Sequence, residues 1–350
     1  MQVQLSGLHI GGITATIPKH SESVDIFKDV FGEKKIKRIK KSTGVEVVHT
    51  VPKGVTASDL CFDAASRLIN ELDIASDSID GILFVSFSPD YKAPATSIIL
   101  QNRLNLNTES VAMDINYGCS AFVYGLYQAG LLIKAGGCKR VLLCTGDTQS
   151  KMINEKDRAM KMIVGDAGTA TIIEEGQDTF NFYLKAIGAK YDKLIIPAGG
   201  YRQPCSEETK KEIRDEDGNI RTAENLYMNG MEVMKFALTE VPPAVDKVLN
   251  MAVLKKADIN LFAFHQPNKL ILDYLSNSMG ISSEKMPVGL QQTGNTGSAS
   301  IPLLLTVLKE RGFDFGKAEN VIACGFGIGL SLGAVNINLS NSVVLGYQEM

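Results

Sequence analysis

The sequence lacks tryptophan altogether and has only four histidines and six cysteines in 350 residues. The cysteines show neither the close pairs of a zinc site nor the density of a disulfide-stapled secreted domain, so we expect reduced thiols and no metal. There is no excess of positive charge either: the chain has 36 Lys and Arg and 39 Asp and Glu, a balance that gives no basis for nucleic-acid binding. No stretch approaches the roughly 20 apolar residues that cross a bilayer, and residues 1–12 lack a secretory signal pattern. We therefore expect a cytoplasmic protein that binds neither membrane nor nucleic acid.

The hydrophobic residues, 45% of the chain, follow an alternation of strands and helices. Continuous runs of Val, Ile and Leu predict buried strands, and apolar residues three and four apart predict helices. In the first half we expect strands at 3–16, 82–87, 110–115 and 141–145, and helices at 57–72, 96–104 and 122–133. In the second half we expect strands at 261–265, 288–291 and 320–324, and helices at 232–249, 270–279 and 299–308. This order indicates a layered α/β fold.

The two halves repeat one another. Residues 141–146 correspond to 321–325, and Cys119 and Asn295 both fall in the turn that opens a long helix. Such a repeat predicts a duplicated unit whose halves face each other around one site, with chance similarity between α/β units as the alternative. The expected amino-terminal half is 1–180 and the carboxyl-terminal half is 231–350. The irregular excursion between them, 181–230, either shapes the pocket or is a loop without a function.

Cys119 lies between a predicted strand and a predicted helix, directly after the turn Asn116-Tyr117-Gly118. A cysteine at the amino end of a helix meets the positive end of the helix dipole, which favours the thiolate and lowers the pKa of the thiol. We therefore predict a nucleophile at Cys119. The alternative is a small buried residue at a strand–helix junction.

Two further residues stand at the ends of neighbouring elements. His265 ends a predicted strand, where open α/β sheets bind their ligands, and Asn295 lies in a glycine-rich turn, where it could equally be a helix cap. With Cys119 they suit acyl-thioester chemistry: the thiolate attacks a carbonyl, and the imidazole and amide donate hydrogen bonds to an enolate. A Cys-His-Asn hydrolase needs the same residue types, so composition does not choose between the two.

A basic run occupies residues 34–41, where six of eight residues are Lys or Arg. Such a run predicts either a site for an anionic ligand or a solvated surface segment.

Short stretches along the chain match one family in order and spacing. They are Ser42-Thr43-Gly44-Val45, Pro89-Asp90-Tyr91 with Pro94-Ala95-Thr96, 116–122, Gly165-Asp166-Ala167-Gly168, 228–233, His265-Gln266-Pro267-Asn268, 294–302 and 325–333. On these stretches the chain resembles the β-ketoacyl-acyl carrier protein synthase III family of the thiolase superfamily, over nearly its full length. The resemblance implies an α/β thiolase-like fold, with duplicated βαβαβαββ halves forming a five-layered αβαβα core, and a homodimer. It also implies no metal or redox cofactor, because coenzyme A enters as the thioester substrate.

The resemblance implies that Cys119 is the acyl-accepting nucleophile and that His265 and Asn295 assist decarboxylation and condensation. The backbone N–H groups of Cys119 and Ile328 would form the oxyanion hole. The expected reaction is the decarboxylating Claisen condensation of an acyl-coenzyme A with malonyl-acyl carrier protein. Acyl transfer to an oxygen or nitrogen acceptor, and a non-catalytic partner subunit, are the alternatives. Asn295 argues against a degradative thiolase, which carries Gly-His-Pro there, and we expect Cys324 to be a buried strand-end thiol.

The chain departs from the family where substrates bind. Arg38 stands where short-chain members place a tryptophan on the adenine of coenzyme A, and Arg158 matches the other adenine-facing residue. The family usually has, just after the motif that ends in Asn268, an arginine proposed to meet the acidic carrier protein. Here Lys269-Leu270 stands in its place, and Lys269 could substitute for it in part. Ala93 replaces a bulky aromatic that often reaches toward the partner's acyl pocket, which predicts room for a longer or branched acyl group. The expected substrate-binding set is Arg38, Ala93, Arg158, Asn268 and Lys269.

Overall fold

The structure, a computed structural model, describes residues 1–216 and 218–350; Asp217, in the expected excursion, lies outside the described residues. The strands are β1 (Gln2–Ile17), β2 (Ser21–Ser23), β3 (Val47–His49), β4 (Gly81–Val85), β5 (Val111–Ile115), β6 (Arg140–Asp147), β7 (Ala167–Ala186), β8 (Leu194–Ile195), β9 (Ile213–Arg214), β10 (Ile220–Arg221), β11 (Tyr227–Met228), β12 (Leu261–Phe264), β13 (Val321–Gly327), β14 (Ser331–Ile337), β15 (Val343–Val344) and β16 (Gln348–Glu349). The α-helices are α1 (Lys28–Phe31), α2 (Glu33–Thr43), α3 (Ala57–Glu71), α4 (Thr96–Arg103), α5 (Ala121–Lys134), α6 (Arg158–Lys161), α7 (Gly230–Ala252), α8 (Lys269–Met279) and α9 (Ser300–Glu310).

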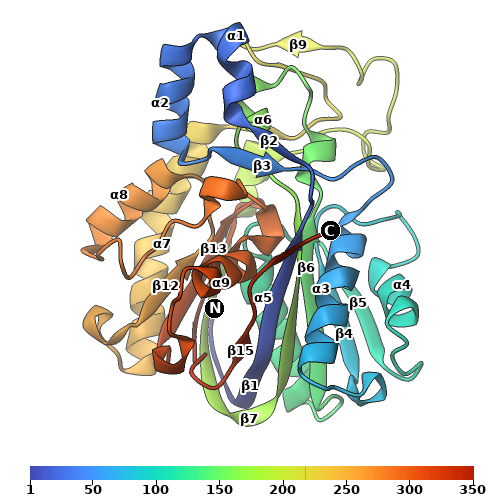
Figure 1. The fold of residues 1–350 in the computed structure, drawn as a ribbon, viewed down its shortest axis with the longest axis vertical. Helices are drawn as coiled ribbons and strands as arrows, with labels where there is room; N and C mark the ends of the chain where they lie inside the picture. The colour runs from blue at the N-terminus through green and yellow to red at the C-terminus, as the bar shows by residue number, and fades with distance from the viewer. Residues whose placement is uncertain (217) are drawn as a thin grey trace.

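Two long antiparallel strands, β1 and β7, join the halves of the molecule (Figure 1). The first part of β7 pairs with β6 and its last part pairs with β14. The sheet therefore runs in the order β12-β13-β14-β7-β6-β4-β5, with β1 along β7 and with β15 and β16 beside β1. Because β7 extends to Ala186, it crosses the expected boundary at residue 180.

Helices cover both faces of the sheet in each half, as the continuous apolar strands require. In β4, Phe84 packs under α3 and α4, whereas its neighbour Leu83 faces α5 and α9. In β12, Ala263 faces α5 and α9, whereas Phe264 packs under α7 and α8. The helices α5 and α9 thus form a central layer between the two parts of the sheet (Figure 1). This is the expected αβαβα arrangement.

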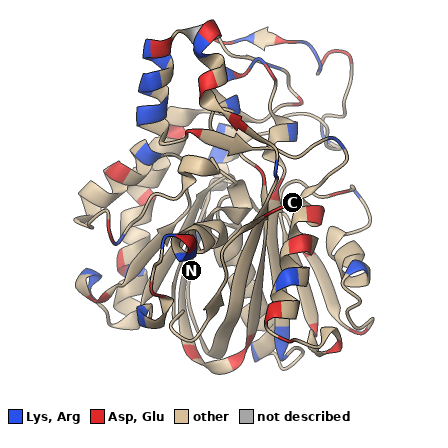
Figure 2. Ribbon diagram, viewed as in Figure 1, with Lys and Arg blue, Asp and Glu red and all other residues tan. Residues whose placement is uncertain are grey.

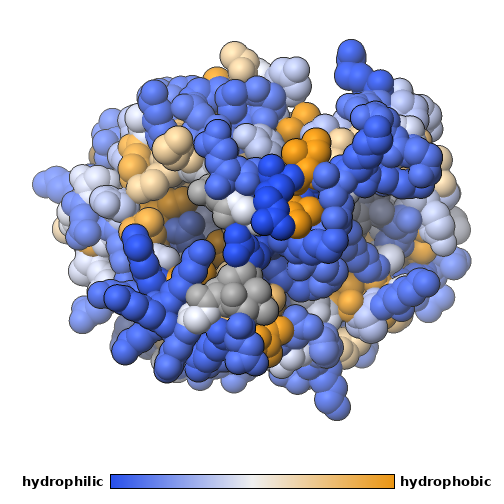
Figure 3. Space-filling model, turned by 90° about the horizontal axis from the view of Figure 1, so that it is seen from above, coloured by the Kyte–Doolittle hydropathy of each residue, from blue (hydrophilic) through white to orange (hydrophobic). Residues whose placement is uncertain are grey.

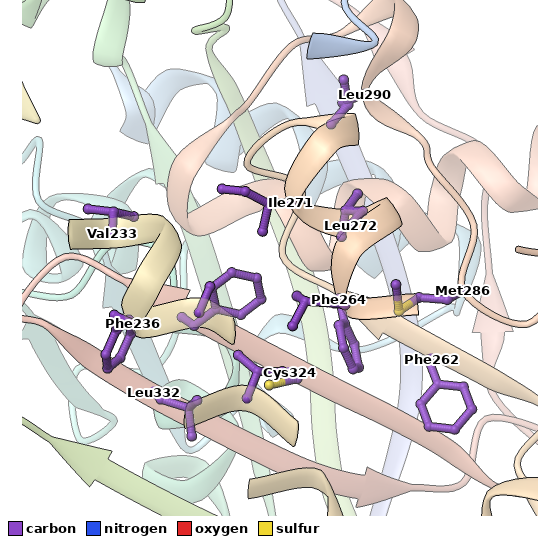
Figure 4. Close-up of a cluster of buried hydrophobic side chains, with 14 of the residues drawn as sticks. Val233, Phe236, Phe262, Phe264, Ile271, Leu272, Met286, Leu290, Cys324 and Leu332 are labelled. Carbon is purple, nitrogen blue, oxygen red and sulfur yellow. The ribbon is translucent and has the colours of Figure 1, made fainter. Parts of the chain in front are cut away.

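Cys324 lies inside the hydrophobic cluster between the sheet and its outer helices (Figure 4). Phe236 of α7, Phe264 of β12 and Leu272 of α8 belong to the same cluster. The Cys324 side chain is fully buried, and burial raises the pKa of its thiol far above the ordinary value. Cys324 is the buried strand thiol that the sequence predicted.

The strand expected at residues 288–291 is wrong, because this segment ends in the 3-10 helix Leu290–Gln292. Pro287 has no N–H group for a strand ladder. A side chain supplies the pairing instead: Oε1 of Gln266 accepts from the backbone N–H of Gly289 at 2.9 Å. The segment is therefore held by a side chain and does not pair with the strands of the sheet.

The excursion holds short elements, with β8 paired to β11 and β9 paired to β10. Across the described residues, none of the helices combines the length and apolarity needed to span a membrane.

Candidate active site

Cys119 lies in the turn between β5 and α5, two residues before the helix begins. A carboxyl-terminal loop, formed by the end of strand β13 with glycine at 325 and 327 and by the turn that follows it, covers the sulfur. A Cβ atom on Gly327, whose φ is 153°, would lie 2.5 Å from the sulfur of Cys119, and a Cβ on Gly325 would lie 2.5 Å from its carbonyl oxygen. Only glycine allows so close an approach. The loop thus brings the two halves together at the sulfur.

The backbone N–H groups of Ile328 and of Cys119 itself lie close enough to the Cys119 sulfur to lower the pKa of its thiol. They are the pair that the sequence analysis assigned to the oxyanion hole. The side chain of Ser331 helps to fix this loop, because its hydroxyl donates to the carbonyl oxygen of Ile328 at 2.7 Å and hydrogen-bonds the Ser120 hydroxyl at 2.8 Å.

The pKa of Cys119 differs from the sequence prediction. Burial raises the pKa of the thiol to about 11, a rise that the two N–H groups only partly offset and that the carboxylate of Asp147 increases. The predicted lowering by the helix end is therefore wrong, since desolvation by the covering loop outweighs it. The free protein holds Cys119 as a thiol at neutral pH.

His265 follows β12, and its side chain is 1% exposed. The ring stands at 87° to Phe326, with centroids 5.6 Å apart, and Phe326 precedes the glycine that contacts Cys119. Nδ1 lies 2.6 Å from the hydroxyl of Ser300, which also accepts from the backbone N–H of Gln266 at 3.4 Å. A hydroxyl in this setting can give its proton to Nδ1, which leaves the ring proton on Nε2. Burial lowers the pKa of His265 to about 3, so the imidazole is neutral.

Asn295 lies in the turn before α9, next to Val164, with which it forms a parallel bridge. Its backbone N–H donates to the carbonyl oxygen of Ile163 at 2.7 Å, and its side-chain oxygen accepts from the N–H of Gly297 at 3.1 Å. Among the described residues, no protein acceptor takes the Nδ2 protons of Asn295 or a proton on Nε2 of His265. Both groups are therefore available to a ligand.

Two polar residues hold this turn, Asp147 at the end of β6 and Gln149 just after it, and the sequence analysis missed both. Oδ2 of Asp147 accepts from the N–H of Ser298 at 2.8 Å, and Nε2 of Gln149 donates to the carbonyl oxygen of Asn295 at 3.0 Å. Asp147 is fully buried, and burial raises its pKa to about 6. Its other oxygen accepts from the Ser86 hydroxyl at 2.8 Å. A carboxylate at the end of a buried strand is the only signal the sequence offers for Asp147, and Gln149 has none.

Two cavities lie along α2 and share Lys35, Ile39 and Ser42. One, of about 350 Å³, is lined by Arg158, and the other, of about 500 Å³, by Arg38. The first cavity reaches Ile163, the residue whose carbonyl oxygen receives the Asn295 N–H. The structure thus places both predicted arginines on one groove that leads to the Asn295 turn.

The other three predicted substrate residues lie outside these two cavities. The Asn268 side chain caps α8 by accepting from the N–H of Ile271 at 2.9 Å, and Lys269 pairs with Asp273. Ala93 is exposed in the loop between β4 and α4. The three are not brought together with Cys119 by contacts within this chain.

An apolar cavity of about 520 Å³ opens beside Cys119, at Gly118 and Ile328. Its lining includes Gly118, next to Cys119, as well as Ile328, Leu194 and Ile196. A space of this kind fits an aliphatic chain. No cluster of metal-binding side chains occurs among residues 1–216 and 218–350.

A cysteine beside two N–H donors, a neutral imidazole, a free amide and a groove with two arginines suit an acyl-thioester enzyme, here built on a duplicated α/β fold. The comparisons agree. Residues 113–189 match the family model for 3-oxoacyl-[acyl-carrier-protein (ACP)] synthase III, and residues 249–339 match the model for its C-terminal part. The chain belongs to the β-ketoacyl-[acyl-carrier-protein] synthase III family.

Individual relatives cover nearly the whole chain. A putative 3-oxoacyl-[acyl-carrier-protein] synthase 3 of Campylobacter jejuni is 32% identical over 97% of this chain and 96% of the relative. A β-ketoacyl-[acyl-carrier-protein] synthase III of Clostridium tetani is 32% identical over 85% of this chain and 88% of its own length. The crystal structure of a 3-oxoacyl-(acyl-carrier protein) synthase from Burkholderia xenovorans superposes with a TM-score of 0.91 at 34% identity, covering 100% of this chain and 99% of the other. The thiolase-like fold expected from the sequence is confirmed.

Proposed function

We propose that this protein condenses an acyl-coenzyme A with a malonyl-acyl carrier protein and releases carbon dioxide. The sulfur of Cys119 attacks the acyl thioester carbonyl, and coenzyme A leaves as its thiol once it takes up a proton. The malonyl thioester then loses its carboxylate as carbon dioxide. The carbanion that remains attacks the acyl-Cys119 carbonyl, and the released sulfur is protonated again. The product is a β-ketoacyl thioester.

The observation that carries the proposal is that His265 and Asn295 keep donors without a protein acceptor among the described residues, while Gly327, next to the Phe326 that contacts His265, lies against the Cys119 sulfur. The N–H groups of Cys119 and Ile328 both lower the pKa of the Cys119 thiol, which supports their assignment to the oxygen of a tetrahedral intermediate. The Nε2 proton of His265 and the Nδ2 protons of Asn295 can stabilise the enolate that decarboxylation forms. A simple acyl transfer has no enolate, and the presence of Asn295 therefore favours condensation.

The raised pKa of Cys119 and the lowered pKa of His265 bear on the first step. With values of about 11 and about 3, the proton stays on sulfur in the free protein. Thiolate therefore has to form together with substrate binding, when the thioester brings its oxygen to the two N–H donors. We infer that the enzyme protects an unreactive thiol until an acyl donor arrives.

The groove along α2 supports coenzyme A as the acyl donor. Arg38 and Arg158 line its two cavities, and guanidinium groups suit both a diphosphate and the face of a purine. The arrangement needs no tryptophan. The cavity beside Gly118 would take the acyl chain. In this proposal coenzyme A is a substrate, and the reaction uses no resident cofactor.

We also propose a homodimer, formed through the outer edge of β5. Among the described residues β5 pairs only with β4, and its five residues are all half-buried. An uncovered edge of this kind offers backbone groups to a second chain. Tyr117 and Tyr124, stacked with ring centroids 4.2 Å apart, lie next to it. The cytoplasmic location stays a prediction from the sequence.

Intact-protein mass spectrometry with a panel of acyl-coenzyme A esters tests the first half-reaction. Wild-type protein and Cys205→Ala, which removes the exposed free cysteine, should gain one acyl group, and Cys119→Ala should gain none. Release of labelled carbon dioxide from carboxyl-labelled malonyl-acyl carrier protein tests the second half-reaction. Acylation without this release would favour transfer to another acceptor, and absence of both would leave a non-catalytic partner subunit.

A further inference from the structure

The basic run found in the sequence forms one helix, α2, at one end of the molecule (Figure 2). It carries six cations and, in its first turn, one acid, Glu33. Only Ile36 and Thr43 of this helix are buried. Figure 3 looks onto this end and shows a largely hydrophilic surface. The helix is therefore held by a small apolar contact and presents most of its charge to solvent.

The cations of α2 divide between two faces. Lys35 and Arg38 line the groove described above, together with Ile39 and Ser42. Lys40 is held by Asp25, at 3.1 Å. The remaining three, Lys34, Lys37 and Lys41, lie at spacings of three and four and so form a stripe on one face of the helix, here called the outer stripe.

The outer stripe is exposed and carries uncompensated charge. Lys34, Lys37 and Lys41 are all exposed, and no ion pair or hydrogen bond of theirs occurs among residues 1–216 and 218–350. Lys37 and Lys41 line neither groove cavity, whereas Lys34 borders one of them. Like charges one turn apart destabilise a helix. A stripe that persists without internal partners fits an anionic partner outside the chain.

Several other exposed lysines have acids beside them. Lys210 and Lys211 pair with Glu207 and Glu208 three residues earlier, and Lys317 pairs with Asp314. Lys269, the position expected from the family resemblance to face the carrier protein, is neutralised by Asp273 on the same helix. Of these two helices, α2 and not α8 therefore presents lysines without an ion pair among the described residues.

We propose that the outer stripe of α2 is the docking surface for the acidic carrier protein that delivers the malonyl group. This inference rests on the proposed condensation. A carrier seated on Lys37 and Lys41 stands beside the groove, whose far end at Ile163 is bonded to Asn295. The thioester arm of the carrier then enters along Lys35 and Arg38. One helix serves both substrates, with coenzyme A in the groove and the carrier on the outer face.

The test is the double variant Lys37→Glu/Lys41→Glu, compared with Lys139→Glu/Lys309→Glu. The control pair is also exposed, lies elsewhere on the molecule and changes the net charge equally. With acyl-coenzyme A saturating, we expect KM for malonyl-acyl carrier protein to rise by about tenfold in the stripe variant, as rim charges are reversed. The kcat, the KM for acyl-coenzyme A and the acylation of Cys119 should stay unchanged, and the control should resemble wild type. In wild type, added salt should raise the same KM, and in the stripe variant it should not.

Three outcomes overturn the proposal or separate it from the proposed function. An equal rise in KM for acyl-coenzyme A would assign the stripe to the coenzyme, and an unchanged KM for the carrier would remove the docking role. If wild type does not condense at all, direct binding of holo-acyl carrier protein to wild type and to the stripe variant still tests the surface. Should the charge reversal prevent folding, Lys37→Gln/Lys41→Gln removes the charges without repulsion, and an unchanged carrier KM in it would equally contradict docking.

Discussion

The side-chain amide of Gln149 donates a hydrogen bond to the backbone carbonyl oxygen of Asn295 at 3.0 Å. This bond crosses from the amino-terminal half to the turn that carries a predicted catalytic amide. The same carbonyl oxygen accepts from the N–H of Gly165 at 3.0 Å. Asp147, which lies two residues before Gln149 in the chain, holds the same turn by accepting from the backbone N–H of Ser298. The position of the Asn295 amide relative to Cys119 therefore depends on polar residues of the opposite half.

Gln149→Ala should impair condensation more than acylation. Loss of the bond lets the Asn295 turn move, and displacements of about 1 Å near the chemistry can cost on the order of a hundredfold in rate. We expect a loss of about tenfold or more in carbon dioxide release from malonyl-acyl carrier protein. Acylation of Cys119, followed by mass spectrometry, should change little, because the N–H groups of Cys119 and Ile328 are not held by Gln149. An equal loss in both steps would indicate a general structural role instead.

Asn295→Ala should separate the two half-reactions more sharply. The amide is assigned to the enolate alone, so the acyl-Cys119 adduct should form at a near wild-type rate. Decarboxylation should fall by about a hundredfold or more, the cost of losing one preorganised donor to a developing oxyanion. Single-turnover acylation and carbon dioxide release measure the two rates in the same preparation. If acylation fell in parallel, the amide would also act on the first thioester.

Much of the fold was readable from the sequence because it rests on local patterns. The continuous apolar run predicted strand β4, and the helical spacing of apolar residues predicted helix α5, both to within a few residues of their ends. Each prediction worked because the buried residues of the element follow the pattern typical of that kind of element. The family and fold class predicted from the short motifs are confirmed. The prediction of a strand at 288–291 failed. The pattern of this segment matches a strand, but Pro287 and the side chain of Gln266 decide how its backbone is paired. That information lies in tertiary contacts.

The site was readable in part. Its three candidate residues could be predicted because each stands at the end of an element, and the duplicated order placed Cys119 and Asn295 at corresponding turns. The pKa of Cys119 was not readable, because it depends on how deeply the loop around Gly327 covers the sulfur. Gln149 could not be found either, since its partner is a backbone oxygen 146 residues away.

Alkylation of Cys119 by iodoacetamide should accelerate steadily with pH. Only the thiolate reacts, and with a pKa of about 11 its fraction rises about tenfold for each pH unit between 7 and 9. The sign follows from burial, which raises the pKa of a thiol and delays its ionisation to higher pH. Peptide mass spectrometry of the Cys205→Ala variant isolates the signal, with Cys119→Ala as the blank. A rate that levels off near pH 7 would mean that the helix end outweighs burial after all.

Filling the apolar cavity should shorten the preferred acyl group. Ile196 is half-buried and lines the cavity that includes Gly118 and Ile328, so an indole in its place would occupy room otherwise open to the acyl chain. In Ile196→Trp we expect the acylation rate of Cys119 to fall by about tenfold or more for the longest esters that wild type accepts, and to change little for acetyl-coenzyme A. Ile213→Trp, on the exposed strand β9, makes the same substitution away from the cavity and should leave the whole profile unchanged. A uniform loss across all chain lengths in Ile196→Trp would show that the cavity does not hold the acyl chain, and would place that chain elsewhere around Cys119.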